Sequence, residues 1–117
     1  MFQKDMNISL LLDFYGDTLS ERRLELMEMY YNEDLSLSEI AEIAGISRQG
    51  VRDSVKKSEK ELLALEEKLG LAKRFKSIES VITGIIEEID DVAAGSDDTE
   101  VKERLKAISQ ELETIEF

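Results

Sequence analysis

The sequence predicts an all-α protein, and three observations point to that fold class. Apolar residues recur every three or four positions over most of the 117 residues, which is the spacing of one face of an α-helix. Proline is absent and glycine occurs only six times, so the chain lacks the frequent turns of sandwiches and barrels. Hydrophobic residues make up 42% and charged residues 36% of the chain, a balance typical of a folded helical domain.

Cysteine and histidine are both absent, and this excludes several kinds of chemistry. Without them the chain has no disulfide, no thiolate nucleophile, no imidazole base, and no zinc or haem site of the ordinary kind. The longest apolar runs fall far short of the roughly 20 residues of a membrane span, and the N-terminus lacks the pattern of a secretory signal. We therefore expect a cytoplasmic protein without a cofactor.

Two helices are predicted before residue 32. The first spans residues 7–15, and Gly16 follows it as the residue after the last turn. Its apolar positions share one face: Ile8, Leu11, Leu12 and Tyr15. The second helix is predicted over residues 19–31, because Thr18 with Glu21 three positions later is the pattern of a capping box. Its apolar stripe comprises Leu19, Leu24, Met27, Tyr30 and Tyr31.

A helix-turn-helix is predicted in the centre of the chain. Ser36 and Glu39 again match a capping box, and the short helix that they open stops at Gly45. Ser47 then caps the next helix, so that only three residues separate the two helices. A glycine-containing connection of this length is the turn of a helix-turn-helix.

Long helices are predicted for the rest of the chain. From Arg48 the helical pattern continues for 22 residues until Gly70, which ends or kinks it. The inward positions of this helix follow heptad spacing: Val51, Val55, Ser58, Leu62, Leu65 and Leu69. Similar stripes run from Leu71 to Val92 and, after a break at Gly95, from Val101 to Ile115. The sequence thus predicts three successive helices, each with an apolar face to be covered.

These stripes lead us to expect a homodimer. The helix from Arg48 is about 33 Å long at about 1.5 Å per residue, which exceeds what we expect the small N-terminal bundle to cover. We therefore predict a helix-turn-helix domain over residues 1–60 and a C-terminal helical dimerisation or interaction region over residues 61–117. A three-helix hairpin that covers the stripes within one chain is the alternative.

Charge is distributed unevenly along the chain, whose formal net charge is −12. Residues 45–60 hold five basic and two acidic residues, a net charge of +3. Residues 61–76 carry +1, whereas residues 1–44 carry −7 and residues 77–117 carry −9. One basic segment therefore lies between two acidic blocks, and phosphate binding depends on such local lysine and arginine.

The candidate site lies at the start of the helix that follows the turn. We predict that it contacts double-stranded DNA through Ser47, Arg48, Gln49, Arg52, Lys56, Lys57 and Lys60. The first turns of a recognition helix face the major groove, where arginine reads guanine and glutamine reads adenine, and lysines further along meet phosphates. Asp53 and the acidic residues before Gly45 weaken the positive field. A helix-turn-helix also occurs in protein-interaction domains, so a role without DNA remains open.

The segment Leu35–Lys60, LSLSEIAEIAGISRQGVRDSVKKSEK, resembles the helix-turn-helix of sigma-factor region 4. Further motifs are LLDFYG at residues 11–16, LSERR from Leu19, MYYNEDLSLSEIA at residues 29–41 and SRQGV at residues 47–51. With them the chain resembles, over about residues 7–92, the YlxM-like family of small bacterial proteins encoded beside the signal recognition particle GTPase. The resemblance implies a helix-turn-helix protein without catalytic residues that acts in or regulates the signal recognition particle pathway.

This sequence departs from the usual pattern of that family at two positions of the recognition helix. Gly50 stands where the family has alanine, which lowers helix propensity by about 1 kcal/mol. Arg52 stands where the family commonly has an aromatic residue, so this helix is more basic and closer to the sigma-factor pattern.

The paired acidic residues do not predict a metal site or catalysis. The pairs are Glu66–Glu67, Glu87–Glu88, Asp90–Asp91 and Asp97–Asp98. Neighbouring carboxylates on a helix diverge by about 100°, so they are interpreted as solvated faces, with Asp97 or Asp98 capping the last helix. Two functions remain: a DNA-binding regulatory protein, or an interaction module that binds signal recognition particle RNA or protein. RNA would bind the basic segment, whereas a basic protein would bind the acidic C-terminal part.

Overall fold

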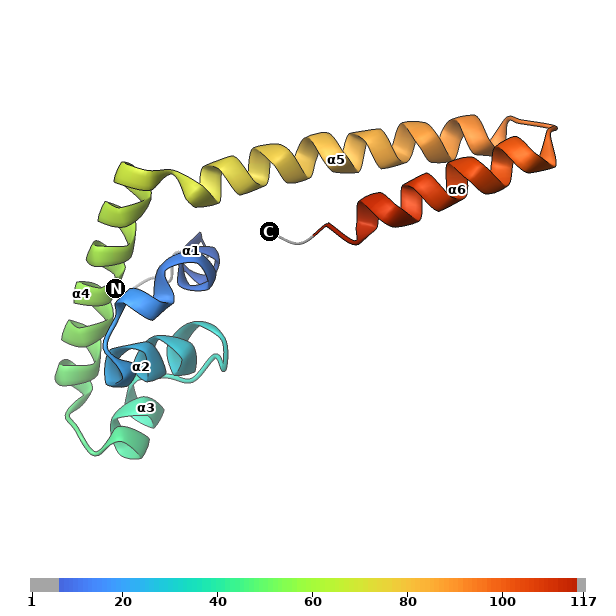
Figure 1. Cartoon of the computed structure of the whole chain (residues 1–117). Coiled ribbons are helices and arrows are strands. Elements are labelled where there is room, and N and C mark those ends of the chain that lie inside the picture. Colours follow the sequence, from blue (N-terminus) through green and yellow to red (C-terminus); the bar gives the residue numbers. More distant parts are fainter. Residues whose placement is uncertain (1–6, 116–117) are drawn as a thin grey trace. The chain divides into compact units, whose positions relative to one another are not determined.

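The computed structural model describes residues 7–115, and this part of the chain holds six α-helices and no strand. They are α1 (Asn7–Tyr15), α2 (Glu21–Tyr31), α3 (Leu37–Ala44), α4 (Arg48–Leu69), α5 (Leu71–Ala94) and α6 (Thr99–Glu113), with a 3-10 turn, η1 (Gly16–Thr18), after α1 (Figure 1). The predicted all-α class is therefore confirmed. The chain divides into two compact units, residues 1–72 and 73–117, and the boundary expected after Lys60 lies inside α4.

In the first unit, α1, α2 and α3 pack against α4 (Figure 1). The side chains without solvent exposure form the centre of its core: Ile8, Met27, Ile40, Val51, Val55, Ser58 and Leu62. The expectation that the second half of α4 lacks a cover is wrong. Helix α1 packs against α4, so among the predicted inward positions Leu62 is fully buried, Leu65 is half-buried, and Leu69 at the end is exposed.

The start of α2 differs from the predicted one. Ser20, not Thr18, caps this helix, because its Oγ accepts the backbone N–H of Arg23 at 3.3 Å. The hydroxyl of Thr18 instead donates to the backbone carbonyl of Tyr15 at 2.6 Å, within η1. The pattern of Thr18 and Glu21 therefore marks the 3-10 turn before α2 and not its cap. The predicted stripe of α2 also omitted Leu26, which is buried.

Glycines end three of the predicted helices in different ways. Gly45 and Gly70 adopt left-handed φ angles of 69° and 63° and end α3 and α4, as the sequence predicts. Gly16 has no positive φ, and its small size is what matters. It is buried after α1, where an added Cβ would lie 3.1 Å from Cδ1 of Leu24.

Side chains from α1 and α4 cap the start of α5. The Tyr15 hydroxyl donates to Oε1 of Glu66 at 2.7 Å and accepts the backbone N–H of Leu71 at 3.1 Å. The same Glu66 oxygen accepts the backbone N–H of Ala72 at 3.0 Å. The first N–H groups of a helix have no partner inside it, and here two of them are satisfied by tertiary contacts. Glu66 therefore has a structural role that the interpretation of paired acids as solvated faces missed.

We expect Tyr15→Phe to make stability less dependent on pH in alkali. Burial, and after it the hydrogen bond to the Glu66 carboxylate, raises the pKa of Tyr15 above its usual 10.0. A raised folded-state pKa contributes stability that is present below the unfolded-state pKa and is lost as pH rises through the folded-state pKa. The free energy of unfolding should therefore fall above about pH 10, and less steeply in the variant.

Urea titrations across that pH range test this prediction. Burial, and after it the charge of Glu59, also raises the pKa of Tyr30. Tyr30→Phe should therefore also reduce the alkaline loss of stability, and the free energy of unfolding of the double variant should fall least. If the free energy of unfolding falls equally steeply with pH in the wild type and in Tyr15→Phe, the prediction is contradicted.

In the second unit, α5 and α6 form an antiparallel hairpin joined by residues 95–98 (Figure 1). Asp98, one of the two cap candidates of the sequence, caps α6 by accepting two backbone N–H groups. Between residues 73 and 115 the only buried side chain is that of Ser109, whose hydroxyl donates to Asp90 of α5 at 2.8 Å. Large apolar side chains that are at least 40% exposed are Ile78, Val81, Ile85, Val92, Val101, Ile108 and Ile115.

Candidate nucleic-acid interface

The helix-turn-helix consists of α3, a short turn and the first turns of α4. Ser36 opens α3 with both bonds of a capping box: its Oγ accepts the N–H of Glu39, and the Glu39 carboxylate accepts the N–H of Ser36, each at 3.1 Å. Gly45 ends α3 in the left-handed conformation. Oγ of Ser47 accepts the backbone N–H of Gly50 at 2.9 Å and so caps α4. These caps confirm the predicted boundaries, and they are local because each joins residues three positions apart.

The core fixes which face of α4 points outward. Val51, Val55 and Leu62 are fully buried against the other helices of the first unit, so the opposite face meets solvent. The predicted contact residues of this helix are exposed, except for the half-buried Arg52: Arg48, Gln49, Lys56, Lys57 and Lys60. The hydroxyl of Ser47 is engaged in the cap, so this residue positions the helix start.

Both acidic residues of the basic segment are held by neighbouring side chains. Oδ1 of Asp53 accepts a hydrogen bond from Nε2 of Gln49 at 2.8 Å. Glu59 accepts a hydrogen bond from the Tyr31 hydroxyl of α2. Glu59 also lines an open groove on α4, together with Lys56, Lys57, Lys60 and Leu63. The first turn of α4 contains no acidic residue, so the positive end of the helix dipole adds to the basic side chains.

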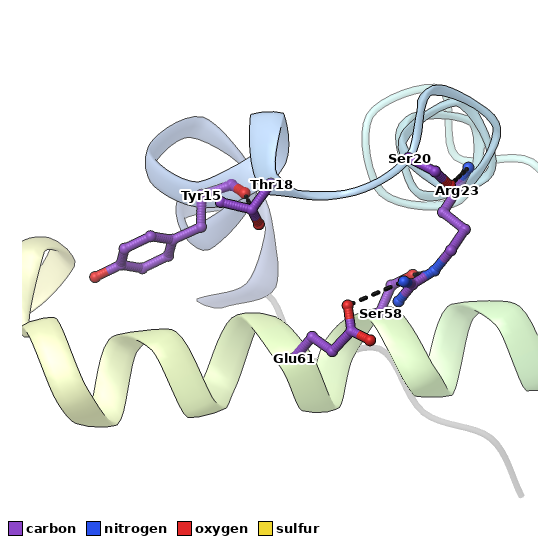
Figure 2. A network of polar contacts seen from close by, with 6 residues as sticks. All are labelled: Tyr15, Thr18, Ser20, Arg23, Ser58 and Glu61. Atoms are coloured by element: carbon purple, nitrogen blue, oxygen red, sulfur yellow. Dashed lines mark hydrogen bonds and ion pairs between the residues drawn. The ribbon is translucent and has the colours of Figure 1, made fainter.

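A polar contact that the sequence analysis missed joins α4 to α2. Nε of Arg23 donates to Oγ of Ser58 at 3.1 Å, and Nη1 of Arg23 lies 2.9 Å from Oε2 of Glu61 (Figure 2). Ser58 is fully buried at a position where the heptad pattern places a core residue. A buried hydroxyl needs a hydrogen-bond partner. A serine at a core position of the heptad pattern was therefore the one signal in the sequence for this contact.

A short capped helix, a glycine turn and a second helix with a basic outer face define a helix-turn-helix protein. The family model of helix-turn-helix proteins described as YlxM / p13 like, UPF0122, matches residues 2–112, and the chain belongs to this family. It is 41% identical over 108 residues to a UPF0122 protein of Thermoanaerobacter sp. (strain X514), covering 92% of each chain. It is 40% identical over 107 residues to a UPF0122 protein of Acetivibrio thermocellus, again covering 92% of each chain. A UPF0122 protein of Desulforamulus reducens is 43% identical over 88 residues, 75% of each chain.

Residues 7–115 show no sign of a membrane span or of a metal site. None of the helices there combines the length and apolar character that a membrane crossing requires. No three acidic side chains in that part of the chain are grouped so that they could hold a metal ion.

Proposed function

We propose that the protein is a cytoplasmic, non-enzymatic regulator that binds duplex DNA through the outer face of α4. The observation that carries the proposal is the placement of five basic residues along that face and at its start, against two acidic residues, Asp53 and Glu59, that accept hydrogen bonds from Gln49 and Tyr31. The chain as a whole carries −12, so attraction to phosphates is confined to this surface.

The residues of α4 fall into two groups by their position. Arg48, Gln49 and Arg52 lie in the first two turns, where a recognition helix meets base edges. Gln49 bonds Asp53, but an amide nitrogen carries two hydrogens, so Gln49 can keep this bond and still donate to adenine. The lysines of the groove lie one to three turns further on, where they meet the phosphate backbone.

A homodimer suits this function. Two copies would place two recognition helices roughly 34–36 Å apart on a two-fold DNA site. We propose that the second unit holds the dimer, because its apolar side chains are exposed whereas those of α4 are covered by the first unit. The link to the signal recognition particle pathway stays a prediction that rests on the family resemblance described above.

Replacing the arginines of α4 by alanine should weaken binding to a selected DNA site. We expect Arg48→Ala and Arg52→Ala each to cost about 1–3 kcal/mol of specific binding, because each removes a contact to a base edge. Lys56→Ala and Lys57→Ala should instead weaken binding to all sequences and reduce the slope of log K against log salt by about one per phosphate contact. Selection from a genomic fragment library at low salt, followed by fluorescence anisotropy, measures both effects.

Lys106→Ala, which removes an exposed lysine from α6, is the matched control and should leave DNA binding unchanged. A library that gives nothing above non-specific binding would reject the DNA proposal. Binding of signal recognition particle RNA that is lost with the same arginines would favour the alternative in which this face binds RNA.

A further inference from the structure

Helix α5 carries an apolar stripe that its own hairpin does not cover. The stripe consists of Ile78, Val81, Ile85 and Val92, whose side chains are 40–61% exposed. Helix α6 packs against the adjoining side of α5, which carries the half-buried Phe75, Ile82 and Ile86. In residues 73–115 only Ser109 is buried, so no large apolar side chain of this part of the chain is fully covered. A surface of this kind indicates a docking site for another protein chain.

Two opposite charges interrupt the stripe at symmetric positions. Arg74 precedes Val81 by one heptad, and Glu88 follows Val81 by one heptad, so all three lie on the same side of α5. Both charged side chains are exposed. Neither of them has an ion-pair partner within residues 7–115.

We propose that the stripe of α5 is covered by the same stripe of a second copy, running antiparallel, with the two-fold axis at Val81. This alignment brings Arg74 of each copy opposite Glu88 of the other, so two complementary pairs flank the apolar contact. A parallel alignment would place Arg74 against Arg74 and Glu88 against Glu88, and like charges in contact oppose association. Charge complementarity therefore favours a second copy of the chain as the partner of the stripe, with its α5 helix running antiparallel.

Gly84 supports a close approach of the two helices. It lies in the middle of α5, where glycine lowers helix propensity, and an added Cβ would meet no atom within 4 Å. Packing inside the unit therefore gives no reason for a glycine at this position. In the antiparallel pair it lies beside the two-fold axis, where a missing side chain leaves room for the neighbouring backbone.

This inference specifies the dimer proposed above and is independent of DNA binding. A protein that dimerises without binding DNA would support it, and a monomer that binds DNA would contradict it. The two proposals are therefore tested by different measurements, the association of copies and the binding of a labelled duplex.

Disulfide cross-linking of the full chain tests the alignment directly. The chain has no cysteine, so each introduced cysteine is unique. Val81→Cys should form a disulfide between copies, because equal residues meet at the axis. Ile78→Cys alone should not, since the two equal residues would be about 9 Å apart along the axis, beyond the roughly 7 Å limit between Cα atoms. A mixture of Ile78→Cys and Ile85→Cys should cross-link.

Charge exchange gives a second test, with sedimentation equilibrium at micromolar concentration as the measurement. Arg74→Glu should raise the dimer dissociation constant on the order of tenfold, because two exposed ion pairs become repulsive at once. Adding Glu88→Arg to that variant should restore association. Glu87→Arg, the same charge change on the neighbouring face, is the matched control and should leave the dimer intact.

Each contrary outcome overturns the proposal. A single wild-type species at the 13.3 kDa mass of the monomer excludes the second copy as the occupant. Self-cross-linking of Ile78→Cys shows a parallel dimer, and a dimer without the Val81→Cys disulfide shows a different interface. An Arg74→Glu dimer that Glu88→Arg does not restore shows that these two charges do not face each other.

Discussion

Leu62→Ala is expected to lower the free energy of unfolding of the first unit by about 2–5 kcal/mol and to leave the oligomeric state unchanged. Leu62 is fully buried on α4, so truncation removes apolar contacts and leaves a cavity that the surrounding helices fill only in part. The sequence alone placed Leu62 on a seam for a partner. Its burial inside one chain instead assigns its effect to folding stability.

Tyrosine fluorescence during urea unfolding measures this effect. All three tyrosines, Tyr15, Tyr30 and Tyr31, lie in the first unit, so the signal reports on that unit. Leu63→Ala is the matched control. Leu63 is the next residue along α4 and its side chain is 47% exposed, so its truncation should cost no more than about 1 kcal/mol. Equal losses in the two variants, or dissociation of a dimer by Leu62→Ala, would show that α4 is packed differently.

Arg23→Leu is expected to destabilise the first unit by about 2–4 kcal/mol. The change removes the hydrogen bond to Ser58 and the ion pair with Glu61, and it leaves the buried Ser58 hydroxyl without its partner (Figure 2). Adding Ser58→Ala should recover part of the loss, because the variant then has no orphaned hydroxyl in the core.

The adjacent arginine provides the control for that experiment. Arg22→Leu changes an exposed residue of α2 whose Nη2 makes only a long, 3.5 Å hydrogen bond to the backbone carbonyl of Ala44, and it should cost less than about 1 kcal/mol in the same urea titration. If Arg23→Leu costs no more than Arg22→Leu, the contact of α2 with α4 does not depend on this side chain. Strictly additive effects of Arg23→Leu and Ser58→Ala would show that these two residues are not coupled.

The sequence predicted the helix-turn-helix accurately because its signals are local. Ser36, Gly45 and Ser47 cap or end their helices through contacts that span a few residues. The start of α2 was misplaced because Thr18 and Ser20 both suit an N-cap. In the structure the Thr18 hydroxyl donates to the backbone carbonyl of Tyr15 within η1, and Ser20 caps α2.

The contacts that hold the helices together were not predictable in the same way. Tyr15 and Glu66 are 51 positions apart, and Arg23 and Ser58 are 35 positions apart, so no short pattern joins them. The cover of α4 by α1 was missed because heptad spacing shows that a face is apolar but not which helix packs on it. The contact residues on the outer face of α4 remain a prediction that DNA-binding measurements will test.

Because α4 is continuous, binding on its outer face has a consequence for amide hydrogen exchange. The first turns of α4 and the core position Leu62 belong to one unbroken helix, so we expect the amides of its buried positions, Val51, Val55 and Leu62, to exchange mainly when the first unit opens as a whole. A ligand that binds only the folded unit suppresses that opening everywhere in the unit. Slower exchange would then extend to Leu11 in α1, which lies on another helix. Protection by a ligand would report stabilisation of the whole unit, so a map of protected amides would not outline the contact surface.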